Sequence, residues 1–196
     1  MADTDIDLID DVVDAAADRG DNLVTTELTA LVERHDPVAI ESNAFGVSVD
    51  RLVAYADALP EGGHEVTPDD VRAAAAEAVE SESWVGGGRL YATGDDHVSV
   101  YPREWHEALA GEDDVRRFVE TIIAEVGDSE AAFGEGGGRG PGVPENVLLN
   151  AVTVLGTPTW EEAKAQLESL RDDDVVAERL DQHPDARVEL VGVDHG

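Results

Sequence analysis

The stretch PENVLLNAVTVLGTPTWEEAKAQLESLRDDDVVAERLDQHPDARVELV, residues 144–191, decides the fold. Its first part is apolar at helical spacing and predicts a helix over 144–155, which Gly156 ends. Thr159 is followed three positions later by a glutamate, the spacing of a capping box, in which the two residues satisfy each other's backbone N–H groups. A second helix is therefore expected over 159–171, directly after a tight turn.

The end of this stretch changes period from helical to alternating. Residues 175–191 contain two short alternating runs around a polar turn, which predicts a β-hairpin. An amphipathic helix is expected earlier, over 112–126, and the glycine-rich segment 127–143 is expected to be a long loop. The order helix, helix, tight turn, helix, hairpin resembles a winged helix-turn-helix. The resemblance is carried by Gly156-Thr157-Pro158-Thr159, the helix Trp160–Arg171 and the hairpin.

The first half of the chain repeats this order more loosely. The expected elements are helices near 24–35, 48–59 and 67–80, followed by a hairpin at 89–101. We therefore predict a mostly α fold with short β-hairpins (α+β), in a tandem winged-helix arrangement. The expected domains are 1–110 and 111–196. Tandem winged helices resemble both transcription regulators and small acidic adaptors of chromosome-organising complexes.

The composition is that of a folded protein, and it fits a reducing compartment. Of the 196 residues, 42% are apolar, which is enough for a core, and cysteine is absent. The sequence contains no apolar run long enough to cross a membrane. Its acidic beginning lacks the basic and apolar regions of a signal peptide. We expect a cytoplasmic protein with no membrane partner.

The charge is strongly acidic. There are 45 acidic and 13 basic residues, for a net charge of −32, and Lys164 is the one lysine. Such a surface repels itself in dilute buffer, whereas at about 1 M salt the Debye length falls to about 3 Å and screens the repulsion. The composition resembles that of cytosolic proteins of halophilic archaea. Acidity is then a property of the habitat, and it counts only weakly against DNA binding.

The helix 159–171 is the candidate recognition helix. Lys164, Gln166 and Arg171 are the side chains expected to reach base edges or phosphates. A solvated helix face is the alternative that the charge balance favours. Glu161 has the helical spacing to pair with Lys164, and Glu168 has the spacing to pair with Arg171.

The hairpin 175–191 would be the wing, and its tip is the place where a winged helix touches the DNA backbone. Arg179 and Arg187 are the candidate contacts there. Asp181 and Asp185 dilute this positive charge. Ordinary surface charge is again the favoured alternative.

No local motif indicates a catalytic, cofactor or metal site. The glycine-rich segment 134–142 lacks the Gly-Lys-Ser/Thr ending of a phosphate loop. None of the six histidines has another four residues away, as a helical zinc site requires. We expect no cofactor, no metal and no enzymatic activity.

Two functions are left open by the sequence. The first is DNA-linked regulation by a winged-helix protein that binds double-stranded DNA. The second is a protein–protein adaptor that uses winged-helix units as interaction modules without touching nucleic acid. A homodimer is also left open, although no heptad seam is present.

Overall fold

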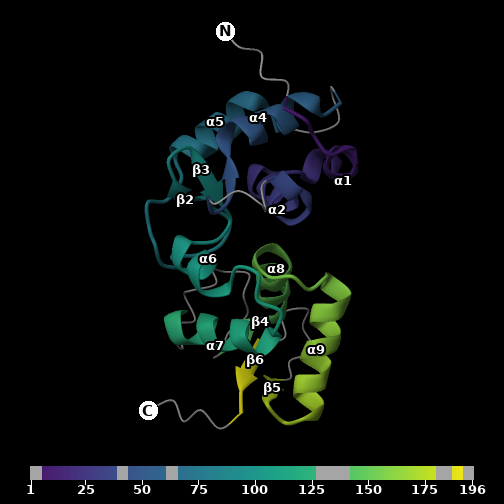
Figure 1. Cartoon of the computed structure of the whole chain (residues 1–196), viewed down its shortest axis with the longest axis vertical. Coiled ribbons are helices and arrows are strands. Elements are labelled where there is room, and N and C mark those ends of the chain that lie inside the picture. The colour runs from purple at the N-terminus through teal and green to yellow at the C-terminus, as the bar shows by residue number, and fades with distance from the viewer. Residues whose placement is uncertain (1–5, 39–43, 61–65, 127–141, 180–186, 192–196) are drawn as a thin grey trace. The chain divides into compact units, whose positions relative to one another are not determined.

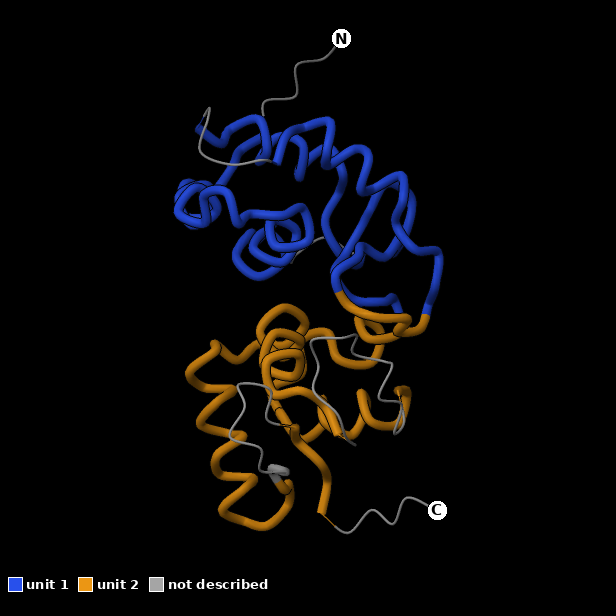
Figure 2. The backbone as a smooth tube through the Cα atoms, turned by 180° about the vertical axis from the view of Figure 1, so that it is seen from behind, with its two compact units in different colours: residues 1–82, 88–103 blue, residues 83–87, 104–196 orange. Residues whose placement is uncertain are grey.

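The structure is a computed structural model that describes residues 6–38, 44–60, 66–126, 142–179 and 187–191 (Figure 1). It is an α+β fold of helices with two small antiparallel sheets. The chain forms two compact units, which are described separately below (Figure 2). Unit 1 contains residues 1–82 and 88–103, and unit 2 contains residues 83–87 and 104–196. Within the described residues, no helix combines the length and apolar character needed to cross a membrane.

Unit 1 begins with helices and ends with a hairpin. Its elements are α1 (Asp10–Ala17), the 3-10 turn η1 (Gly20–Asn22), α2 (Thr25–His35), β1 (Val47–Ser48), α4 (Val49–Ala58), α5 (Pro68–Ala76), β2 (Tyr91–Gly94) and β3 (His97–Ser99). The strand order is β1-β3-β2, so the short β1 pairs with β3, the second strand of the hairpin. Its core joins helix faces and strands around Leu28, Leu52 and Tyr55, each with no exposed surface.

Unit 2 repeats that order. Its elements are α6 (Arg103–Leu109, without its first residue), α7 (Val115–Val126), β4 (Val143–Pro144), α8 (Glu145–Leu155), α9 (Trp160–Asp172), β5 (Val176–Arg179) and β6 (Arg187–Leu190). The strand order β4-β6-β5 is the counterpart of β1-β3-β2. Each unit thus has a helix, a short strand, two helices and a hairpin whose last strand is central. This arrangement is compatible with a winged-helix topology.

The start of the short strand is built in the same way in both units. Gly46 precedes β1 with φ +78°, and Gly142 precedes β4 with φ +95°, a backbone region that glycine adopts at little cost. A Cβ atom on Gly46 would collide with the carbonyl of Val98, and one on Gly142 with the carbonyl of Val188. In both units glycine therefore allows the short strand to approach the central strand closely.

We call α5 and α9 the third helices, counting α2, α4 and α5 in unit 1 and α7, α8 and α9 in unit 2. They also begin in the same way. Thr67 caps α5 and Thr159 caps α9, and both form capping boxes with an acidic residue at the third helical position, Asp70 or Glu162. The two sequences are Thr-Pro-Asp-Asp-Val-Arg-Ala from 67 and Thr-Trp-Glu-Glu-Ala-Lys-Ala from 159. The shared pattern aligns the two helices residue by residue, and in this alignment Arg72 corresponds to Lys164.

The expected helices and hairpins are all present within the described residues, with ends shifted by a few positions. The expected helix 67–80 stops at Ala76, because the chain turns at Glu77 toward Val79, which forms a bridge with Tyr91. The two-residue strands β1 and β4 were not expected, since two residues are too few to show alternation. The expected glycine-rich loop lies outside the described residues except for Gly142 and Val143. Residues 104–110, assigned above to the first domain, group with unit 2.

Candidate interaction surface

The outward face of α9 is the surface on which DNA contacts were expected. Lys164 lies on this face and is exposed. The other exposed charged residues of the helix are acidic: Glu161, Glu162, Glu168 and Asp172. Trp160 opens the helix, and the residue is 42% exposed. The face therefore combines an exposed ring with a net negative charge.

Two of the expected DNA contacts hold unit 2 together. The amide nitrogen of Gln166 donates to the Asp113 carbonyl at 3.0 Å, and its amide oxygen accepts from the Val115 N–H at 3.2 Å. Gln166 thus joins α9 to the beginning of α7. The Arg171 guanidinium donates to the Glu145 carboxylate at 2.5 Å, and both side chains are about one-fifth exposed.

The arginine at the base of the second hairpin is also internal. Arg187 is 4% exposed, and its Nη1 donates to the carbonyl of Gly142 at 3.0 Å. This contact lies next to the register pair of Pro144 and Arg187 in the β4–β6 ladder. The backbone of Arg179 forms part of β5, while its side chain and the hairpin tip lie outside the described part of the chain.

The outward face of α5, the counterpart of α9, is also acidic. Asp69 and Asp70 are exposed there, together with Arg72, and the exposed Glu77 follows the helix directly. The guanidinium of Arg72 pairs with the Asp69 carboxylate at 2.9 Å. Such an exposed pair is weak, but it satisfies the cation locally. Neither third helix presents a net positive surface.

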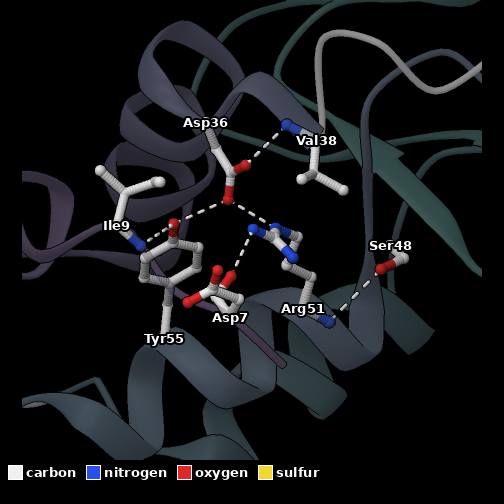
Figure 3. Close-up of polar contacts among 7 residues, drawn as sticks. All are labelled: Asp7, Ile9, Asp36, Val38, Ser48, Arg51 and Tyr55. Atoms are coloured by element: carbon white, nitrogen blue, oxygen red, sulfur yellow. Dashed lines mark hydrogen bonds and ion pairs between the residues drawn. The ribbon is translucent and has the colours of Figure 1, made fainter. Parts of the chain in front are cut away.

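A buried polar network fastens the elements of unit 1 (Figure 3). The Asp36 side chain, at the end of α2, has no exposed surface. Its Oδ2 accepts from Arg51 Nε at 2.5 Å and from the Tyr55 hydroxyl at 2.7 Å, and its Oδ1 accepts from the Val38 N–H at 2.9 Å. The network extends to the segment before α1, because Arg51 donates to the Asp7 carbonyl and the Ile9 N–H donates to the Tyr55 hydroxyl (Figure 3).

The network stabilises the fold and does not provide a group for acid–base catalysis. Burial raises the pKa of Asp36, but the hydrogen bonds from Arg51 and Tyr55 outweigh burial and leave the pKa below its ordinary value. Burial and the bond to Asp36 raise the pKa of Tyr55 to about 12. Acid and phenol are therefore held in one protonation state each at neutral pH, and neither is available as a general acid or base.

A second buried acid, Glu33, lies on α2 against the end of β3. Its Oε2 accepts from the Val100 N–H at 3.2 Å, and the residue is 5% exposed. Burial raises its pKa to about 7, although hydrogen bonds from Ser99 and Val100 oppose the shift. Tyr101 lies close by, and its pKa is raised by burial and by the charge of Glu33.

An aromatic pair occupies unit 2. The rings of Trp84 and Trp105 stack with centroids 4.8 Å apart and planes 10° apart. The Glu125 carboxylate on α7 accepts from the Trp84 backbone N–H at 2.6 Å and from the Trp105 indole N–H. Burial raises the pKa of Glu125, and these two bonds oppose the shift. The residues Ser83–Gly87 are thereby fastened to α6 and α7.

The histidines do not form a metal centre in the described part of the chain, where no three metal-ligating side chains come together. His106 is buried on α6, and burial lowers its pKa to about 4, so its ring is neutral at physiological pH. His97 is held at the hairpin turn by a 2.9 Å contact between its Nδ1 and the Asp95 carbonyl.

The comparisons with known proteins give no relative. No family model, no curated protein and no solved structure matches this chain.

The buried acids were not identified as important from the sequence, although a signal was present. Glu33 follows Leu28, Leu31 and Val32 on the inward side of its helix, where a carboxyl needs donors from another element. Asp36 ends α2 just before Pro37, and Arg51 lies directly before buried Leu52. In a chain with 45 acidic residues, however, one acid near an apolar stripe cannot be distinguished by sequence from the many exposed ones.

Proposed function

We propose that this chain is a non-enzymatic adaptor of two winged-helix units that binds other proteins through the outer faces of its third helices. The observation that carries the proposal is the charge of α5 and α9. Their exposed faces hold six acidic residues, Asp69, Asp70, Glu161, Glu162, Glu168 and Asp172, against Arg72 and Lys164. A DNA interface needs side chains that donate to phosphates and base edges, and among the charged side chains of these faces only Arg72 and Lys164 could do so, whereas a protein partner does not require such donors.

The halophilic composition supports the same proposal. In molar salt, screening weakens surface ion pairs, while burial of apolar surface keeps its strength or gains from salting-out ions. The exposed ring of Trp160, at the beginning of α9, supplies apolar area for such a contact. The excess of acidic over basic residues, 45 against 13, then serves solubility rather than recognition.

DNA-linked regulation is the second candidate. It is favoured by the repeated helix, strand, helix, helix, hairpin order and by Lys164, which is exposed on α9. Gln166, Arg171 and Arg187 make internal contacts instead. A DNA interface would therefore depend on Lys164 and on the hairpin side chains.

One double variant separates the two candidates. Ala73 and Ala165 occupy equivalent exposed positions on α5 and α9. Replacing both with arginine adds bulk and positive charge to each third-helix face. For a protein adaptor, we expect the bulk to abolish capture of partners from a high-salt lysate. For a DNA-binding protein, we expect the added cations to strengthen binding to duplex DNA.

The DNA measurement is fluorescence anisotropy of labelled duplex, titrated with the protein across about 0.5 to 2.5 M KCl. We expect no saturable binding by the natural chain at any salt. Salt-resistant binding that weakens in Lys164→Ala, and strengthens in the double arginine variant, would replace the adaptor proposal with the DNA-binding one.

A further inference from the structure

A groove in unit 1 lies between one side of α5 and the hairpin of β2 and β3. Its volume is about 490 Å³, and residues of α4, α5 and both hairpin strands line it. Three alanines, Ala75, Ala76 and Ala92, provide an apolar lining without bulk. The groove is open to solvent and long side chains of the unit do not fill it.

The comparison of the two third helices shows why the groove exists. With Thr67 aligned on Thr159, Ala75 corresponds to Leu167 and Ala76 corresponds to Glu168. Leu167 is fully buried in unit 2. Ala75 thus leaves space where the equivalent position of the other unit holds a buried leucine, and this difference contributes to the groove.

The rim of the groove is negatively charged. Asp50, at the start of α4, and Asp96, at the hairpin turn, both line it and are exposed. Arg72 also lines it, but its guanidinium pairs with Asp69, which is outside the groove. His97 also lines the groove, and its Nδ1 contacts the Asp95 carbonyl. The lining thus holds two carboxylates against one guanidinium, and its net charge is negative.

The rim is also held in place by the backbone. Asp96 has φ +56°, a conformation that non-glycine residues adopt at a cost and keep only where the surroundings fix it. Its carbonyl accepts from the Val49 N–H at 2.9 Å, which ties the hairpin turn to the start of α4. The two carboxylates are thus carried by elements that are fastened to each other.

We propose that this groove receives an arginine side chain of a partner protein. The aliphatic stem would lie on the alanines, and the guanidinium would donate to Asp50 and Asp96. A guanidinium is weakly hydrated and planar, so it loses less on entering such a site than an ammonium does. The stem keeps its apolar contribution in molar salt.

This proposal rests on the adaptor function and names its partner chemistry. The probe is N-acetyl-arginine methylamide, added to the whole chain in about 2 M KCl, where nonspecific charge attraction is screened. We expect methyl NMR shifts concentrated at Ala75, Ala76 and Ala92, with the millimolar dissociation constant typical of a ligand of this size. The uncharged citrulline analogue, which keeps the shape, should bind about tenfold more weakly.

Two test variants, each with a matched control, examine the two rim carboxylates and the alanine lining separately. Asp50→Asn/Asp96→Asn should weaken arginine binding about tenfold, while Asp57→Asn, at an exposed position of α4 that does not line the groove, should not change it. Ala76→Leu should fill the groove and abolish the shifts, while Ala73→Leu, also exposed on α5, should leave them intact. Spectral dispersion of each variant checks that unit 1 is folded.

Equal shifts with the citrulline analogue, or shifts that survive both test variants, would overturn the proposal. Groove shifts that appear on concentrating the protein without a probe would also overturn it, in favour of self-association. The failure of this site is distinguishable from that of the adaptor function. The third-helix arginine variants would still abolish partner capture if only the groove assignment were wrong.

Discussion

The carboxyl group of Glu33 titrates near neutral pH because α2 buries it against the end of β3. Its pKa is raised from 4.5 to about 7 on folding, so the folded state binds the proton more tightly than the unfolded state. The associated stability is fully present below about pH 4.5 and is lost as the pH rises through 7. The free energy of unfolding should therefore fall by about 3 kcal/mol over this interval.

We expect Glu33→Gln to flatten this pH dependence and to make unit 1 more stable than the natural chain at alkaline pH. Urea unfolding at a series of pH values, at constant high KCl, measures both effects. Glu77→Gln, at an exposed site of the same unit, is the matched control. An unchanged pH slope in the Glu33 variant would show that another group titrates there.

The buried ion pair of Asp36 and Arg51 gives a second prediction for single residues. Arg51→Met leaves the Asp36 carboxylate buried without its cation, and this should lower the free energy of unfolding by about 3–5 kcal/mol. Adding Asp36→Asn to that variant should restore part of the loss, because the uncompensated charge disappears. Urea unfolding of the single and double variants gives the coupling energy, and strictly additive losses would contradict the network described here.

At the scale of elements, the two capping boxes provide a matched pair of tests. Thr67→Ala and Thr159→Ala each remove a side-chain acceptor from an exposed helix start, and each should cost about 1 kcal/mol. Amide hydrogen exchange should show the loss locally, in the first turn of α5 or of α9. Protection lost equally along both helices in either variant would argue against independent caps.

The elements predicted from sequence are those whose signals are local. The capping box at Thr159 places the start of α9 correctly, and the stop at Gly156 places the end of α8. The apolar spacing places α2, α4, α7 and α8. The partners of Gln166, Arg171 and Arg187 could not be predicted, because each contacts a residue more than 25 positions away. The helical spacing predicts Glu168 as a partner of Arg171, whereas the structure pairs Arg171 with Glu145 of α8. The groove likewise depends on elements that only the fold brings together.

At the scale of the whole molecule, the net charge of −32 should make folding depend on salt. Repulsion between exposed carboxylates is strong at low ionic strength and is screened when the Debye length falls to about 3 Å. We expect circular dichroism and the melting temperature to show loss of structure as KCl is lowered to tens of millimolar. A melting temperature that does not change between dilute buffer and molar KCl would remove the halophilic interpretation.

The position of Lys164 has a practical chemical consequence. It is the one lysine of the sequence, and it is exposed on the outer face of α9. An amine-directed reagent therefore finds a single side-chain target, apart from the terminal amino group. A photo-crosslinker attached there would report which molecule approaches the third helix of unit 2, whether that molecule is a protein or a nucleic acid, without any change to the sequence.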